Sequence, residues 1–208
     1  QGYSSAASDV YKRQAINCFL PPGKPAAEGK QKEPYKDIEG NYTQPDALTG
    51  EQRIAADAIK SAIDEGRQEN FLIHGVTASG KTQVYMEVIS ECLDRGRTAI
   101  VLVPEISLTG QLIERFVGRF GKEAIAVMHS RLTQRERYDE WQRIRSGKAK
   151  IVIGARMGVF APLANIGSII MDEEHEASYK SDMTPKYDTV EIALKRTCLL
   201  YTSDAADE

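Results

Sequence analysis

A glycine-rich octapeptide at residues 75–82, GVTASGKT, limits the possible folds of this chain more than any other segment. It matches the pattern G-x-x-x-x-G-K-[ST] and lies between a short apolar segment, residues 71–73, and a helical pattern over residues 81–95. A strand, a glycine loop and a helix in this order turn successive backbone N–H groups toward one point at the positive end of the helix. We therefore expect a P-loop that binds the phosphates of a nucleotide.

The residue types in this loop fit that chemistry. Gly75 and Gly80 let the backbone approach a phosphate closely, and Lys81 supplies a mobile charge for the β and γ phosphates. The hydroxyl of Thr82 is a ligand that Mg²⁺ accepts. The predicted nucleotide-binding residues of the loop are Gly75, Thr77, Ser79, Gly80, Lys81 and Thr82.

Short apolar strands alternate with helical patterns along the rest of the chain. Strands that read as continuous apolar runs, alternating with helices, indicate a parallel sheet covered on both faces. The sequence thus predicts an α/β class, a three-layer lobe with a mainly parallel sheet. The expected strands are residues 71–73, 98–103, 124–128, 150–153 and 169–171, and the expected helices are 54–63, 81–95, 108–117, 133–145 and 190–196.

The two ends of the chain differ from this pattern. Residues 4–14 and 199–208 lack a sustained period and resemble translated sequencing adapter. Residues 21–46 hold five of the eight prolines, which predicts a solvated, semi-extended linker. We expect residues 1–46 to be a non-native head and linker, 47–198 the folded lobe, and 199–208 a non-native tail.

Composition restricts the partners. With 27 Lys and Arg against 30 Asp and Glu, the net charge of −3 excludes a basic coat over the whole surface, although a local basic patch remains open. Apolar runs are too short to span a bilayer, and no charged-then-apolar signal opens the chain, so we expect no membrane partner and a cytoplasmic location. The three cysteines have no metal-site spacing, and Cys92 is expected to be a buried apolar residue.

A second chemical signal is the segment SIIMDEEH at residues 168–175. An apolar strand that ends in acids places Asp172 at the carboxyl edge of the sheet, where ligands bind in such folds. Asp172 is expected to hold Mg²⁺, and Glu173 to orient and deprotonate the attacking water. Alone, such an acidic run is typical of a solvated surface.

Together with the P-loop, Asp172–His175 resembles the DEAH-related box of superfamily 2 helicases. A longer set of segments is similar to the primosomal protein N′ (PriA) family of replication-restart helicases, in the expected order over about residues 47–187. The matching segments are 48–52, 75–82, 102–109, 128–141, 150–167 and 171–180. The resemblance implies a RecA-like first lobe of an ATP-dependent 3′→5′ DNA helicase.

The same resemblance implies cofactors, partners and residue roles. It implies ATP and Mg²⁺ as cofactors, with zinc only in a second lobe, and single-stranded or forked DNA and replication-restart (primosome) proteins as partners. The expected catalytic residues are Glu173, Asp172 and Lys81. Gln52 matches the glutamine that reads adenine, but Thr49-x-x-Gln52 is also a capping box at a helix start, and both roles can hold.

Three further residues are candidates for contact with DNA, namely Arg156, His129 and Arg131. The resemblance matches Arg156 to a motif that touches the DNA strand, whereas His129 and Arg131 come just after an expected strand, at the sheet edge where a DNA groove would lie. Arg156 is equally consistent with a solvated loop arginine, and His129 with a hydrogen-bonded loop histidine. Residues 131–150 carry seven Lys and Arg against three acids, which suits either phosphate contacts or an ordinary charged helix surface.

The sequence differs from the family pattern in two respects, and two alternative functions remain open. Residues 185–189 do not match the Tyr-His-Ala-Arg pattern that often follows the acidic box, and the second lobe that the resemblance implies is not among these 208 residues. The alternatives are another superfamily 2 DNA translocase, or a nucleotide-binding fragment without turnover of its own.

Overall fold

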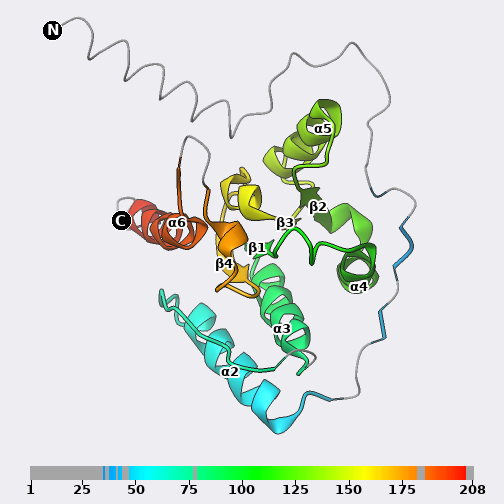
Figure 1. The fold of residues 1–208 in the computed structure, drawn as a ribbon. Helices are drawn as coiled ribbons and strands as arrows, with labels where there is room; N and C mark the ends of the chain where they lie inside the picture. The colour runs from blue at the N-terminus through cyan, green and yellow to red at the C-terminus, as the bar shows by residue number, and fades with distance from the viewer. Residues whose placement is uncertain are drawn as a thin grey trace, which may run out of the picture.

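The computed structural model describes residues 35, 38–40, 42–43, 47–76, 79–181 and 186–204, with the backbone alone for 198–204. Its centre is a parallel sheet of four strands, in the order β2-β3-β1-β4 (Figure 1). The strands are β1 (Thr98–Leu102), β2 (Ile125–Met128), β3 (Ile151–Gly154) and β4 (Ile166–Met171). The prediction of an α/β lobe with a parallel sheet is confirmed.

Alternate strand residues supply the two apolar layers. Val101 packs on one face with residues of α3 (Lys81–Asp94) and α4 (Gly110–Phe120). Ile100 packs on the other face with residues of α5 (Gln134–Arg145) and α6 (Thr189–Asp204). β1, β2 and β3 are buried throughout, as the continuous apolar runs predicted. Outside these layers, α2 (Gly50–Asp64) packs on α3 through Ile63, Val88 and Cys92, and the last is fully buried as expected.

Threonine caps fix the starts of three helices. The Thr49 side chain accepts the Gln52 N–H at the start of α2, and Thr133 accepts the Glu136 N–H at the start of α5. Both form full capping boxes, because the side chains of Gln52 and Glu136 accept the cap N–H in return. Thr109 caps α4 in the same way, with one hydrogen bond.

Short 3₁₀ segments complete the lobe at Lys122–Ala124 (η1), Arg156–Phe160 (η2) and Ala177–Tyr179 (η3). α6 runs through Asp204, beyond the boundary expected at residue 198. None of the helices in the described part of the chain is long and apolar enough to cross a membrane.

A buried ion pair ties α5 to the sheet. Glu140 is 1% exposed and accepts the backbone N–H of Val127 at 2.8 Å, while Arg143 donates to Glu140 at 2.7 Å. Arg143 also donates to three backbone carbonyls in η1 and at the start of β2, those of Lys122, Glu123 and Ile125. Arg143 therefore does not belong to the basic surface of residues 131–150, because its guanidinium is buried and bonded to Glu140 and to backbone carbonyls.

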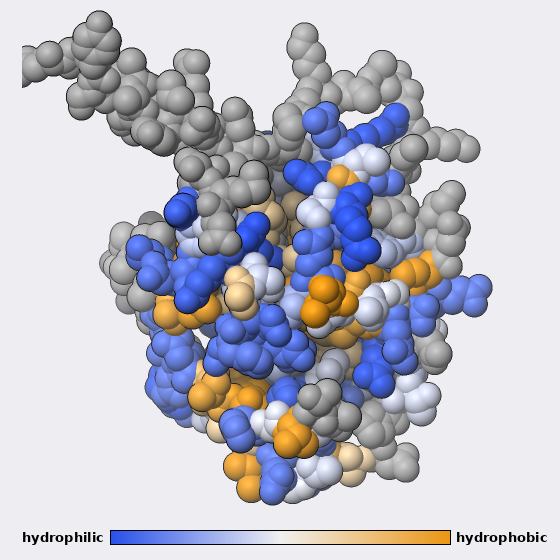
Figure 2. Space-filling view, in the orientation of Figure 1, coloured by the Kyte–Doolittle hydropathy of each residue, from blue (hydrophilic) through white to orange (hydrophobic). Residues whose placement is uncertain are grey.

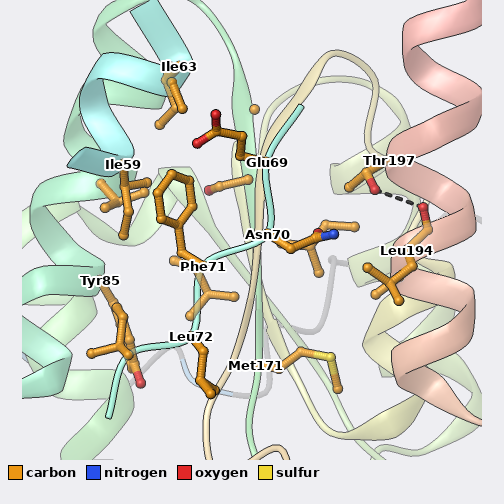
Figure 3. A pocket seen from close by; sticks show the side chains of 18 of the residues that line it. Ile59, Ile63, Glu69, Asn70, Phe71, Leu72, Tyr85, Met171, Leu194 and Thr197 are labelled. Carbon is orange, nitrogen blue, oxygen red and sulfur yellow. Dashed lines mark hydrogen bonds between the residues drawn. The ribbon is translucent and has the colours of Figure 1, made fainter. Parts of the chain in front are cut away.

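The predicted strand at residues 71–73 is wrong. This segment has no regular structure, and Phe71 and Leu72 are 41% and 79% exposed. Phe71 instead points toward Ile59 and Ile63 of α2 (Figure 3). Such a short run gains few ladder hydrogen bonds, so apolar contact with α2 competes with pairing.

The described part of the predicted linker also differs from expectation. Tyr35, Ile38 and Tyr42 are half-buried against the core under α3 and α4, so this part is not simply solvated. We call residues 35–43 the strap; its described residues run beside α4 (Figure 1). Tyr35, Ile38 and Tyr42 pack against the core because burying their apolar surface is more favourable than exposing it to water.

Hydrophilic and hydrophobic residues are intermixed over the face drawn in Figure 2. In the described chain, the large exposed apolar side chains are Ile54, Phe71, Leu72, Val76, Ile106 and Leu194.

Candidate nucleotide-binding site

Among the described residues of the P-loop, Gly80 has the unusual backbone conformation that a glycine allows. Gly80 caps α3 with φ +83°, a left-handed conformation that favours glycine. A Cβ at Gly80 would collide with the side-chain amide of Gln52, and one at Gly75 would lie 2.7 Å from the Ser79 hydroxyl. The backbone conformation therefore favours glycine at residue 80, and a Cβ at either residue would force the neighbouring Gln52 or Ser79 side chain to move.

Lys81 begins α3, and its ammonium group lies over the loop. Its Nζ donates to the carbonyls of Gly75 at 2.7 Å and Val76 at 3.2 Å. These two acceptors hold the charge at the place where phosphates are expected. Thr82 is in the first turn of the same helix, whereas Thr77 lies outside the described residues.

The side chain of Gln52 makes two hydrogen bonds. Its side-chain oxygen accepts the Thr49 N–H at 3.0 Å, and its side-chain N–H donates to the Ser79 carbonyl at 3.0 Å. The capping-box role is confirmed. The second bond places the Gln52 amide directly against the P-loop, where the adenine-reading role remains a prediction.

Asp172 follows β4 at the carboxyl end of the sheet. Its backbone N–H donates to the Leu102 carbonyl at 2.9 Å and extends the ladder with β1. Its side-chain Oδ1 accepts the hydroxyl of Tyr85 at 3.1 Å, and its carbonyl accepts the hydroxyl of Tyr179 at 2.7 Å. Two tyrosines thus fix the backbone and the carboxylate of one acid.

Tyr85 was not predicted as a site residue. It is buried on α3 one turn after Lys81, so its hydroxyl joins the P-loop helix to the acidic segment. Burial and the neighbouring Asp172 carboxylate raise the pKa of Tyr85 well above its ordinary value. The hydroxyl therefore stays protonated and donates to Asp172. The spacing of four residues after the lysine was the available signal.

Glu173 has a backbone conformation that is uncommon for its residue type. Its φ is +49°, in the left-handed region, and its side chain is exposed. The turn is closed by the Glu176 N–H, which donates to the Glu173 carbonyl at 2.9 Å. Such strained residues gather at functional sites, where the surrounding fold holds them.

A cleft of about 940 Å³ begins at these residues. One end is lined by Lys81, Tyr85, Asp172 and Glu173, and the rest runs along the free side of β4 between α2, α3 and α6. Figure 3 shows its middle, with residues 69–72 crossing between Tyr85 and Met171. The P-loop lysine and the acidic pair therefore face one shared space.

A model of the DEAD/DEAH box helicase family matches residues 52–203. The chain belongs to this family. The PriA resemblance is also confirmed, since the sequence is 49% identical over 173 residues to the replication restart protein PriA of Bacillus subtilis, covering 83% of this chain and 21% of that protein. It is 47% identical over 150 residues to PriA of Treponema pallidum, covering 72% and 22%. The chain spans about a fifth of the length of these relatives.

Membership of the DEAD/DEAH box family implies nucleotide binding with a metal. Among the residues that the structure describes, no group of three or more His, Cys, Asp or Glu side chains could hold a metal alone. Mg²⁺ does not need such a group, because it binds through one or two carboxylates and substrate phosphates. The oxygen donors of Asp172 and Thr82 fit that requirement.

The three candidate DNA residues of this helicase lobe follow neighbouring strands. His129 and Arg131 come directly after β2, and Arg156 begins η2 after β3. Parallel strands put these loops at the same edge of the sheet as Asp172 after β4. Arg156 donates to the Lys180 carbonyl at 2.6 Å and lies over the ring of Tyr187. A DNA role for the three residues remains a prediction.

Proposed function

We propose that residues 47–198 are the ATP-binding first lobe of an ATP-dependent 3′→5′ DNA helicase that acts in replication restart and primosome assembly. The observation that carries the proposal is that Lys81 and Asp172 line one cleft, where the hydroxyl of Tyr85, on the same helix as Lys81, donates to Asp172 at 3.1 Å. The relatives are replication restart proteins PriA, and this name supports the biological setting. The whole activity belongs to a longer protein, because this chain spans only about a fifth of the length of these relatives.

Each loop residue has a distinct task in this proposal. The backbone N–H groups of the P-loop receive the phosphates of ATP, and Lys81 exchanges two carbonyl acceptors for phosphate oxygens. Gln52, already against the loop, reads the adenine. Thr82 and Asp172 would hold Mg²⁺, which supplies neutralising charge for the phosphates. Glu173 orients the attacking water and accepts its proton.

The first test is a titration of this chain with Mg·ATP and Mg·ADP. Lys81→Ala should weaken binding by about 1.5–3 kcal/mol, the usual worth of hydrogen bonds made by a charged group. The matched control is Lys195→Ala, which removes an equal charge from an exposed position on α6. Equal affinities for the parent and Lys81→Ala would refute nucleotide binding at this loop.

We further propose that the lobe contacts single-stranded or forked DNA through Arg131 and Arg156, with His129 in the same loop as Arg131. A net charge of −3 leaves few phosphate contacts, so log K should fall with log salt by about 0.7 per phosphate neutralised. Arg131→Ala and Arg156→Ala should each reduce that slope for every DNA sequence. A strong base-sequence preference would contradict this contact mode.

Comparing forked with plain duplex DNA in the full-length protein separates a replication-restart helicase from another superfamily 2 translocase. Preferential stimulation of ATP hydrolysis by forks supports the proposal. If no DNA stimulated ATP hydrolysis, the protein would bind nucleotide without coupling hydrolysis to translocation.

A further inference from the structure

The strap is fixed closely against α4. Gly40 lies so near this helix that a Cβ on it would come within 2.6 Å of the Gly118 Cα. Tyr42 then donates its hydroxyl to Gln83 of α3 at 3.1 Å and accepts from Arg119 of α4 at 2.7 Å. Described residues of the strap therefore hold a defined place on the lobe.

At its other end the strap reaches the loop after β2. The hydroxyl of Tyr35 lies 2.5 Å from Nε2 of His129, and the two rings meet edge to face with centroids 5.9 Å apart. The second ring nitrogen of His129, Nδ1, accepts the backbone N–H of Arg131 at 3.1 Å. One histidine thus joins the strap to the residue proposed to contact DNA.

These two bonds define the protonation of the ring. Because Nδ1 accepts an N–H, a neutral His129 carries its proton on Nε2 and donates it to the oxygen of Tyr35. Burial, with the nearby charges of Arg131 and Arg137, lowers the pKa of His129, which favours this neutral form. Both nitrogens are then engaged inside the protein.

We propose that Tyr35 is a positioning residue that, through His129, fixes the backbone of Arg131 and so the presentation of its side chain to a DNA phosphate. His129 in this arrangement shapes the loop and does not donate to DNA itself. Arg131 is exposed at this position. The proposal rests on the proposed DNA binding by this lobe.

The first experiment reads the ring of His129 without any DNA. The chain has three histidines, so ¹⁵N NMR of imidazole-labelled protein can resolve each ring. The parent should show Nδ1 unprotonated and Nε2 protonated. In Tyr35→Phe, which keeps the aromatic packing and removes the hydroxyl, the two nitrogen shifts should move toward each other. Tyr42→Phe removes the other strap hydroxyl and should leave His129 unchanged. Identical His129 shifts in the parent and Tyr35→Phe would overturn the proposal.

The second experiment measures single-stranded DNA binding by fluorescence anisotropy at fixed salt. Tyr35→Phe should weaken binding about fivefold, as expected for one lost hydrogen bond, and Tyr42→Phe should not. In an Arg131→Ala background, Tyr35→Phe should cause no further loss, because its effect passes through Arg131. Unchanged affinity in Tyr35→Phe, or losses that add in the double variant, would overturn the proposal.

The two experiments separate the two proposals. A parent chain that binds no DNA would refute the proposed DNA contact, and with it the DNA part of this inference. The NMR comparison would still decide whether Tyr35 controls the tautomer of His129.

Discussion

Replacing Arg143 with methionine should destabilise this lobe more than most single substitutions. Methionine keeps much of the apolar stem but cannot donate to Glu140 or to the carbonyls of Lys122, Glu123 and Ile125. Glu140, 1% exposed, would then be a buried charge that has lost the Arg143 guanidinium. Breaking such a pair from one side costs about 3–5 kcal/mol, a large part of the roughly 5–15 kcal/mol that stabilises a domain.

Urea unfolding followed by circular dichroism measures this loss. With a slope of about 2 kcal/mol per molar urea, the midpoint should fall by about 2 M. The control on the same helix is Arg135→Met, because Arg135 and Asp139 form a longer pair of 3.8 Å and the Arg135 side chain is 38% exposed. That change should alter stability by about 0.5 kcal/mol or less.

A second variant makes the cause explicit. Adding Glu140→Gln to Arg143→Met removes the buried charge of Glu140, so part of the lost stability should return. If Arg143→Met cost no more than Arg135→Met, the ion pair would not stabilise the packing of α5 on β2, and the reasoning would be refuted.

Three further predictions concern the site and its pH dependence. Asp172→Ala should weaken metal-dependent nucleotide binding, whereas Glu173→Gln in the full-length protein should keep binding and lose about 10²- to 10⁴-fold in turnover; parental turnover would move the base to another residue. Tyr85→Phe should leave metal-free nucleotide affinity unchanged and alter the Mg²⁺ concentration for half-maximal binding, because it frees Oδ1 of Asp172; an unchanged Mg²⁺ dependence would exclude a positioning role. Because the folded pKa of His129 lies below its ordinary value, the unfolded chain takes up the proton first as pH falls below about 6.5. The free energy of unfolding should therefore fall more steeply between pH 7.5 and 5.5 in the parent than in His129→Gln, and equal slopes would contradict the shift.

Local patterns in the sequence predicted most of the fold. Gly66 and Gly96 follow the ends of α2 and α3 with positive φ, and the β-branched run at residues 98–103 became a strand buried on both faces. The left-handed turn at Gly80 was predictable because it depends only on the backbone of the glycine itself. The prediction of a strand at residues 71–73 was wrong because apolar character alone does not determine which surface a segment will contact.

The contacts that join the site could not be predicted in this way. Tyr85 and Asp172 are 87 residues apart in the chain, and Tyr35 and His129 are 94 residues apart. Periodicity assigns a residue to a face of its own element, whereas these hydrogen bonds depend on how separate elements pack. Proline content likewise predicted a linker without indicating that Tyr35 would find a partner on the lobe.

The left-handed backbone of Glu173 has a consequence for the directed evolution of this protein. An acidic side chain gains nothing from that conformation, which asparagine and glycine adopt at lower cost. A library selected for thermal tolerance alone should therefore drift away from glutamate at this position, while one selected for ATP turnover should retain it. The two selections would give different residues at position 173, and this difference would identify Glu173 as a position where catalysis is kept at the expense of stability.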